Sequence, residues 1–127
     1  MSEIPESLLY TSEHEWIREE DDGVLTVGVT DHAQESLGDV TFVELPDIGQ
    51  SFERNAVFGV VESVKAASDL FMPVSGEIVA TNDGLNDSPE KVNDDPYQEG
   101  WMIKVKASED SVEKGLLDAA GYAAEIS

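Results

Sequence analysis

The feature that most constrains the fold of this chain is a predicted β-hairpin near its middle. Two apolar segments, residues 57–64 and 71–79, flank a short stretch of small and polar residues. Segments of this kind are typical of two paired strands joined by a turn, with Pro73 and Gly76 indicating an edge or a bend in the second arm. Lys65 lies in the turn and is the first lysine of a chain with 7 basic and 28 acidic residues. The pattern predicts one primary amine at the hairpin tip, within reach of solvent.

Other short apolar segments predict a chain dominated by strands. The expected elements are strands at residues 14–18, 24–29, 40–45 and 101–106, a turn at 21–23, a short helix at 33–37 capped by Thr30 or Asp31 and followed by Gly38, and a polar loop at 82–98. Helical spacing in the tail predicts two short helices separated at Gly115 and Gly121, with Ser111 and Asp118 as caps. Many short strands with turn residues between them indicate a β-sandwich or a flattened barrel. The core is expected to include Trp16, Phe42, Phe58, Trp101 and Ile103.

Length and composition indicate one domain. A chain of 127 residues can bury one core but not two. We therefore expect a single domain over residues 1–127, with a core at about 8–107 and a helical tail at about 109–126. The absence of cysteine excludes disulfide bonds and thiolate metal sites, and fits a reducing cytoplasm. The acidic N-terminal residues lack the positive region of a signal peptide, and no segment has the length and apolarity of a membrane span.

The net charge of −21 limits the partners that the protein can bind. It repels nucleic acid and anionic membranes, so neither is an expected partner. It also opposes compaction unless salt screens it, and at about 1 M salt the screening length is only about 3 Å. We therefore interpret the acidity as a halophile-like adaptation to a salty cytoplasm. Neighbouring acids at residues 19–22 and 94–95 are expected to be solvated and to bind no metal.

The segment around Lys65 resembles a known attachment motif. Residues 62–77, with Ser-Val-Lys-Ala at their start, resemble the lipoyl-attachment motif of the glycine cleavage system H protein family. Other segments resemble that family in the same order, and together they lie between about residues 8 and 125: they are residues 10–16, 28–34, 38–40, 42–46, 96–97 and 100–105. Two departures are Glu13, where the family often has serine, and the bulkier pair Phe71–Met72.

The resemblance implies a fold and a set of site residues. The implied fold is all-β dominated, the barrel-sandwich hybrid of lipoyl and biotinyl domains, with a short internal helix and C-terminal helices. The implied cofactor is lipoate, bound as an amide to Lys65. The residues implied in the attachment motif and its recognition are Glu62, Ser63, Val64, Ala66 and Asp69. Glu15 and Asp69, with His14 beside them, are implied as the cleft that holds the amine of the loaded arm, although the local pattern alone makes Glu15 a solvated strand residue.

The resemblance also implies a function without catalysis. An H protein carries the aminomethyl group of glycine from a pyridoxal-phosphate glycine decarboxylase to a tetrahydrofolate-dependent aminomethyltransferase, and dihydrolipoyl dehydrogenase then reoxidises it. A lipoate-attaching enzyme is a fourth partner, and the chain is expected to be monomeric in isolation. The sequence has no Gly-rich phosphate loop and no His-acid constellation of recognisable spacing, which argues against an enzyme.

Other carrier functions remain as alternatives. Some H-like proteins act as scaffolds or donors that pass lipoate to other enzymes, and the sequence is compatible with that function. A biotin carrier usually has Met-Lys-Met, whereas Val64 and Ala66 flank the lysine here. A lipoyl domain of a 2-oxoacid dehydrogenase typically has Asp-Lys-Ala and continues into a Pro/Ala-rich linker, and this sequence has neither.

Overall fold

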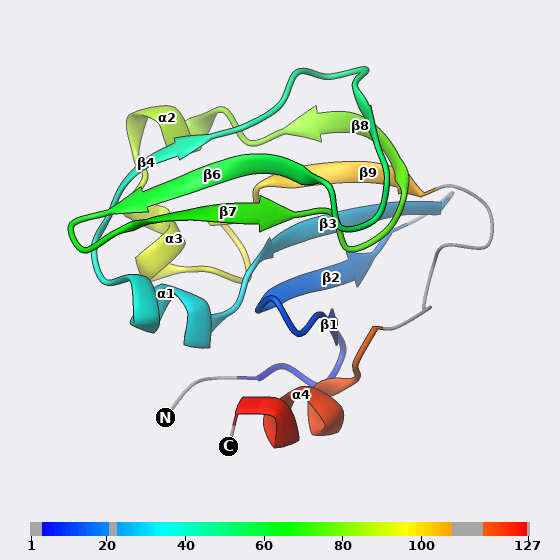
Figure 1. The fold of residues 1–127 in the computed structure, drawn as a ribbon, viewed down its shortest axis with the longest axis horizontal. Helices are drawn as coiled ribbons and strands as arrows, with labels where there is room; N and C mark the ends of the chain where they lie inside the picture. Colours follow the sequence, from blue (N-terminus) through cyan, green and yellow to red (C-terminus); the bar gives the residue numbers. More distant parts are fainter. Residues whose placement is uncertain (1–3, 21–22, 108–115, 127) are drawn as a thin grey trace.

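The computed structural model describes residues 4–20, 23–107 and 116–126, and these form two antiparallel sheets (Figure 1). The larger sheet has the strand order β1 (Leu9–Tyr10), β2 (Glu15–Glu19), β3 (Val24–Val29), β9 (Ile103–Ala107), β8 (Gly76–Thr81) and β5 (Ser51–Phe52). The smaller sheet has the order β4 (Val40–Glu44), β6 (Val57–Ser63) and β7 (Ala67–Phe71). The predicted two-layer β architecture is therefore confirmed.

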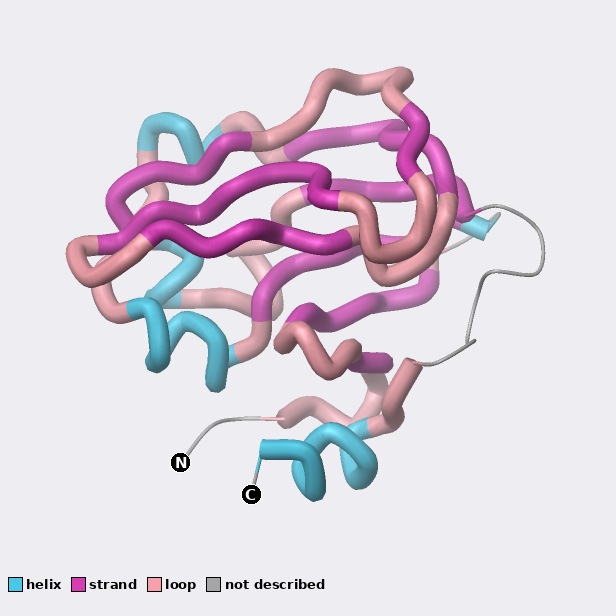
Figure 2. Tube along the Cα trace, viewed as in Figure 1, coloured by secondary structure: helices cyan, strands magenta, loops and turns pink. Residues whose placement is uncertain are grey.

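The core lies between the two sheets. Apolar side chains from both sheets form one buried cluster, which includes Val27 of β3, Ile78 of β8, Val61 of β6 and Leu70 of β7. In β8, residues 76–79 are alternately buried and exposed, because successive side chains of a strand point to opposite faces of the sheet. Figure 2 shows that strands form the body of the molecule and that the short helices lie at its margins.

The expectation that residues 71–79 form one arm of the hairpin is wrong. The second arm is β7, which ends at Phe71, and the chain then crosses to the larger sheet and continues as β8. Pro73 has no N–H to donate to a sheet, so pairing stops there. Gly76 allows the close entry into the larger sheet, because a Cβ at this position would lie 2.5 Å from the carbonyl oxygen of Lys106. The hairpin proper is thus β6 and β7.

Helices are partly as expected. Helix α1 (Asp31–Leu37) begins after its N-cap Thr30 and ends at Gly38, as predicted. The segment expected as a polar loop at 82–98 contains α2 (Gly84–Asp87) and α3 (Lys91–Asp94), whose buried residues are Leu85 and Val92. Such single turns with one apolar residue each leave no helical period in the sequence.

The C-terminal helix α4 (Ala119–Ile126) runs through Gly121, so the predicted break there is wrong. Gly121 lies in the first turn of the helix, and its N–H donates to Oδ1 of Asp118 at 2.7 Å. The side chain of Asp118 therefore caps the first turn of α4 through the N–H of Gly121, as predicted for this aspartate. Residues 21–22 of the predicted turn, the predicted cap Ser111 and the predicted break at Gly115 lie outside the described residues.

Two aromatic residues expected in the core are not fully buried. Phe42 is 45% exposed, because an irregularity in the pairing of β4 with β6 between Val40 and Phe42 shifts the alternation of β4. Trp101 is half-buried and packs against a second apolar cluster. Trp16, Phe58 and Ile103 are buried, as predicted.

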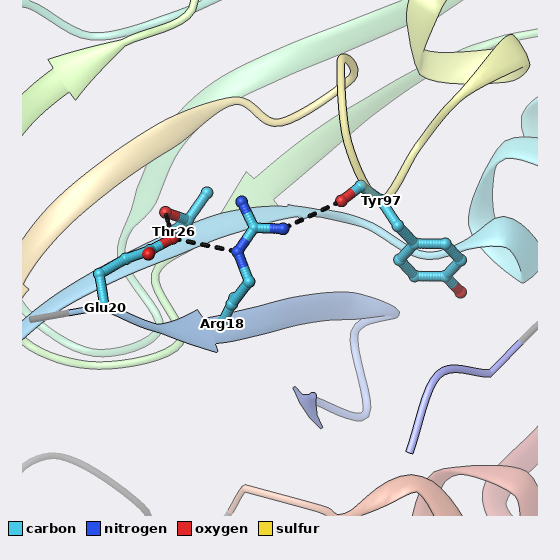
Figure 3. Close-up of polar contacts among 4 residues, drawn as sticks. All are labelled: Arg18, Glu20, Thr26 and Tyr97. Atoms are coloured by element: carbon cyan, nitrogen blue, oxygen red, sulfur yellow. Dashed lines mark hydrogen bonds and ion pairs between the residues drawn. The ribbon is translucent and has the colours of Figure 1, made fainter. Parts of the chain in front are cut away.

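This second cluster holds the loop before β9 on the outer side of β2. Trp16 is fully buried in it, and its Nε1–H donates to the carbonyl oxygen of Pro96 at 2.9 Å. Arg18 adds two polar contacts: its guanidinium donates to the carbonyl oxygen of Tyr97 at 3.2 Å and to Oε2 of Glu20 at 3.0 Å. The hydroxyl of Thr26 donates to the same Glu20 oxygen at 2.7 Å (Figure 3).

Among the described residues, no helix has the length and apolarity that a membrane span requires.

Candidate carrier site

The tip of the β6–β7 hairpin is a tight turn that Ser63 organises. The Ser63 N–H donates to the carbonyl oxygen of Ala66 at 2.8 Å. The Ser63 hydroxyl oxygen accepts from the N–H groups of Lys65 and Ala66, both at 3.2 Å, and its proton is donated to the Ala66 carbonyl at 3.1 Å. The Val64 N–H donates to the carbonyl of Asp39 at 3.0 Å, which attaches the turn to the segment after α1. The backbone that presents Lys65 is therefore fixed.

Lys65 is exposed, and its aliphatic stem lies over the end of α1. Gly38 there has a φ of +77°, and a Cβ on it would lie 3.1 Å from Cε of Lys65 and 3.6 Å from its Cδ. Glycine is the residue that adopts this φ without strain, and it leaves room for the lysine. The same glycine thus ends α1 and supports the stem of Lys65.

A cavity of about 230 Å³ lies beside the lysine, between the hairpin and α1. Most of the surface that faces it is apolar, although half of the residues that line it are polar or charged. The lining residues are Glu13, His14, Val29, Ala33, Ser36, Leu37, Val61, Lys65, Ala66, Ser68, Asp69 and Leu70. Asp69 is exposed, so its carboxylate lies at the solvent side of this cavity.

Larger hollows elsewhere do not reach the lysine. One of about 530 Å³ lies beside β5 and β8, and another of about 420 Å³ lies beside β4. Neither contains Lys65, Asp69 or His14 among its lining residues. A third hollow, of about 360 Å³ between residue 5 and the segment 93–98, also lacks these three residues in its lining. Among these hollows of the described residues, the cavity beside Lys65 is the one that brings a reactive amine to a mainly apolar surface.

Glu15 is buried in an adjoining pocket of about 70 Å³. It is only 2% exposed, and its Oε2 accepts a hydrogen bond from the Phe71 N–H at 2.7 Å. Its Oε1 has no hydrogen-bond partner among the described residues. Burial is the main reason that the pKa of Glu15 is raised to about 8, against the lowering effect of the Phe71 N–H. At neutral pH this carboxyl group is therefore largely protonated.

The structure places the two expected cleft acids in neighbouring pockets. Asp69 lines the lysine cavity, Glu15 lines the adjoining pocket, and Glu13 lines both. The local pattern suggested a solvated Glu15, but its position in β2 puts it on the same strand face as the core residue Ile17. The spacing of two residues between Glu15 and the apolar Ile17 is the sequence pattern that could have predicted the burial of Glu15.

His14 lines the lysine cavity and forms a hydrogen bond with Tyr122 of the C-terminal helix. Its φ is +68°, and its Nδ1 lies 2.9 Å from the hydroxyl oxygen of Tyr122 in α4. The same Tyr122 oxygen lies 2.7 Å from Oγ1 of Thr30. Burial lowers the pKa of His14, and the nearby His32 lowers it further, while Glu13 and Glu125 raise it. Sequence reasoning gave no sign of this contact, because it joins residues 108 positions apart.

The remaining motif residues are exposed or line the cavity. Glu62 and Val64 are exposed, and Ala66 lines the lysine cavity. A lipoyl group has an apolar chain and a small dithiolane ring, and the apolar walls Val29, Leu37 and Leu70 suit such a group. The residues present therefore fit lipoate on this lysine.

A lysine presented on a rigid hairpin beside a sheltering cavity defines a class of protein, the carriers that bear a prosthetic group on a lysine side chain. The model of the glycine cleavage H-protein family matches residues 8–127. The chain belongs to this family, which supports a lipoyl-carrier role and places its partners within the glycine cleavage system.

Individual relatives agree with the family assignment. The chain is 56% identical over 127 residues to the glycine cleavage system H protein of Chromohalobacter salexigens, covering 100% of this chain and 97% of that one. It is 57% identical over 124 residues to the Klebsiella pneumoniae protein of that name, covering 98% and 96%. The crystal structure of a glycine cleavage system H protein from Mycobacterium marinum superimposes with a TM-score of 0.89 at 40% identity, covering 97% of this chain and 98% of that chain.

Proposed function

We propose that this chain is a single, non-catalytic carrier domain that bears lipoate as an amide on Lys65 and works in the cytoplasm. The observation that carries the proposal is the exposed Lys65 at the tip of a fixed hairpin, with its stem on Gly38 and a mainly apolar cavity beside it. Lipoate, when bound, supplies the disulfide that accepts the aminomethyl group of glycine.

The residues of the chain position and shelter that arm. A lysine side chain with a lipoyl group reaches on the order of 14 Å, so it can enter the active site of a docked enzyme. Attachment at one end keeps the arm at an effective concentration in the millimolar range there. Between enzymes, the apolar walls of the cavity exclude water, and the carboxylate of Asp69 attracts a protonated amine. The buried carboxyl group of Glu15 becomes a second carboxylate when that amine lies beside it and its positive charge favours the ionised form.

The proposed partners follow from this carrier role. They are glycine decarboxylase with pyridoxal phosphate, aminomethyltransferase with tetrahydrofolate, dihydrolipoyl dehydrogenase, and a lipoate-attaching enzyme. The last is proposed to read the exposed residues around Lys65, with Glu62 and Val64 on one side and Ala66 and Asp69 on the other. The net charge of −21 implies that the docking faces of these enzymes carry positive charge.

Peptide mapping after lipoylation tests the attachment site. We expect one lipoyl adduct, on Lys65, and we expect Lys65→Arg to accept none while it unfolds at the wild-type temperature, because the side chain is exposed. Lys104→Arg, in strand β9, is the matched control and should be lipoylated normally. An adduct on Lys91, Lys104 or Lys106 would refute the assignment.

Reconstitution tests the carrier role. Lipoylated wild-type protein should support glycine decarboxylation and one-carbon transfer with the three enzymes, and Lys65→Arg should support neither. If the lipoylated protein instead only passes lipoate to other enzymes, the role of lipoate donor is correct and the carrier role is wrong.

A further inference from the structure

A chain of hydrogen bonds connects the C-terminal helix to the wall of the lysine cavity. Thr30, Tyr122 and His14 form it, and Thr30 and Tyr122 are both fully buried. Thr30 lies before α1 and Tyr122 in α4, so the bonds join three separate parts of the fold. His14 also lines the cavity that contains Lys65.

The direction of these bonds follows from the hydroxyl protons. Oγ1 of Thr30 accepts from the Ala33 N–H at 3.2 Å, so its own proton needs an acceptor, and the oxygen of Tyr122 at 2.7 Å provides one. The Tyr122 proton is then donated to Nδ1 of His14. In the opposite direction His14 donates to Tyr122 and Tyr122 to Thr30, which leaves the buried Thr30 proton without an acceptor among the described residues. Unpaired buried protons are costly, so the first direction is favoured.

This direction fixes the state of His14. An Nδ1 that accepts a hydrogen bond carries no proton, so the ring is the neutral tautomer protonated on Nε2. The charged groups around the ring have mixed signs: His32 comes from α1, Glu125 from α4 and Glu13 from the preceding residue, and Lys65 and Asp69 face the same cavity. Burial also lowers the pKa of His14, in agreement with a neutral ring.

We propose that Tyr122 is a positioning residue for the carrier arm, which holds His14 as an uncharged wall of the lysine cavity while the arm carries a protonated amine. The proposal rests on the proposed function, in which the arm on Lys65 carries that amine. A charged imidazolium at this wall repels the ammonium group and exposes it to water. A neutral imidazole leaves the attraction of the Asp69 carboxylate for the amine undiminished.

The first test is spectroscopic and requires no lipoate. Nitrogen-15 chemical shifts of the two imidazole rings report tautomer and charge, and a His32→Gln variant assigns them, since the chain has 2 histidines. In the full unlipoylated chain at pH 7, His14 should carry its proton on Nε2. In Tyr122→Phe, the ratio of neutral to charged His14 at pH 6 should fall about two- to tenfold, the equivalent of one ordinary hydrogen bond. A His14 that carries its proton on Nδ1, or that is cationic in wild type at pH 7, would overturn the proposal.

The control variant removes a neighbouring hydroxyl. Tyr122→Phe keeps the ring that stacks on Tyr10 at a centroid distance of 4.8 Å, so α4 should stay in place. Tyr10→Phe keeps the same stack and loses a hydroxyl that donates to the Pro5 carbonyl, away from His14. Tyr10→Phe should therefore leave the His14 signals unchanged. A His14 change of equal size in both variants would mean that the stack, and not the hydrogen bond, controls the ring.

The second test uses the loaded arm. The lifetime of the aminomethylated protein should shorten about two- to tenfold in Tyr122→Phe at pH 6, and the two proteins should converge at pH 8, where His14 is neutral in both. Equal lifetimes at pH 6, together with a changed His14 ratio, would overturn the role in the arm. Failure of the wild type to accept lipoate would refute the proposed function, while the tautomer result would stand on its own.

Discussion

The stem of Lys65 lies against Gly38, at a point where a Cβ atom would come within 3.1 Å of the lysine Cε. The two residues belong to different elements, the hairpin turn and the end of α1. The fold therefore fixes both the backbone position of Lys65 and the surface along which its side chain lies.

Gly38→Ala should disturb the lysine as well as the backbone. The φ of Gly38 is +77°, which costs an alanine about 1 kcal/mol. Gly23→Ala is a matched control, because Gly23 has the same φ of +77° and no atom lies within 4 Å of the point that a Cβ would occupy there. Denaturant unfolding should show a similar loss of stability in both variants. Only Gly38→Ala should slow lipoate attachment to Lys65, and equal attachment rates would show that the stem contact has no role.

Glu15→Gln should stabilise the protein at alkaline pH. Because folding raises the pKa of Glu15 from 4.5 to about 8, the folded state holds a proton that the unfolded state releases between these values. The associated stability is present below pH 4.5 and is lost as pH rises to about 8. The difference in unfolding free energy between Glu15→Gln and wild type should therefore grow over this window, by at most about 1.4 kcal/mol per pH unit, and then level off. A difference that is constant with pH would show that Glu15 is not buried as a neutral group.

The two cleft acids should matter only when the arm carries an amine. Glu15→Gln and Asp69→Asn should accept lipoate and be reoxidised by dihydrolipoyl dehydrogenase at wild-type rates, because the disulfide form has no amine. The positive charge of the amine favours the ionised form of Glu15, so each acid can form a charge-assisted hydrogen bond worth about 1.5–3 kcal/mol. Without that bond, the lifetime of the aminomethylated form should shorten about ten- to a hundredfold. Glu62→Gln, an exposed residue of the same hairpin, is the control. Lifetimes equal to wild type in both cleft variants would show that other groups protect the amine.

Salt should raise the thermal midpoint of unfolding. With a net charge of −21, repulsion within the folded state weakens as the screening length shortens. The midpoint should rise from low salt to molar KCl and flatten above about 1 M, where that length is near 3 Å. Sucrose stabilises proteins without screening charge and is the control. A midpoint that KCl leaves unchanged would show that the acidic surface serves solubility alone.

Local features of the fold were predictable from the sequence. Thr30 and Gly38 bracket α1 because N-cap and C-cap preferences depend on a few neighbouring residues. The turn at Lys65 was predictable for the same reason, since the side chain that organises it, Ser63, is only two residues away. The overall two-layer architecture followed from the number of short strands.

Features that depend on distant partners were not predictable. The division of residues 71–79 between two sheets depends on the pairing of β8 with β9, which no local pattern encodes. The exposure of Phe42 depends on an irregularity in its pairing with β6. At the site, the hydrogen bond from the Phe71 N–H to Glu15 and the contact of His14 with Tyr122 join segments that are far apart in the chain. The cleft acids were assigned by resemblance, and their separation into adjoining pockets required the structure.

The turn that holds Lys65 is shaped within four residues, Ser63 to Ala66, whereas the cavity beside it is assembled from segments far apart in the chain. The acceptor and its shelter can therefore change independently during evolution. A substitution at a cavity residue outside the hairpin, such as Ala33 or Leu37, alters how long a cargo survives, yet leaves the turn that a modifying enzyme meets unchanged. One modification apparatus can thus serve carriers whose cavities have diverged toward different partners.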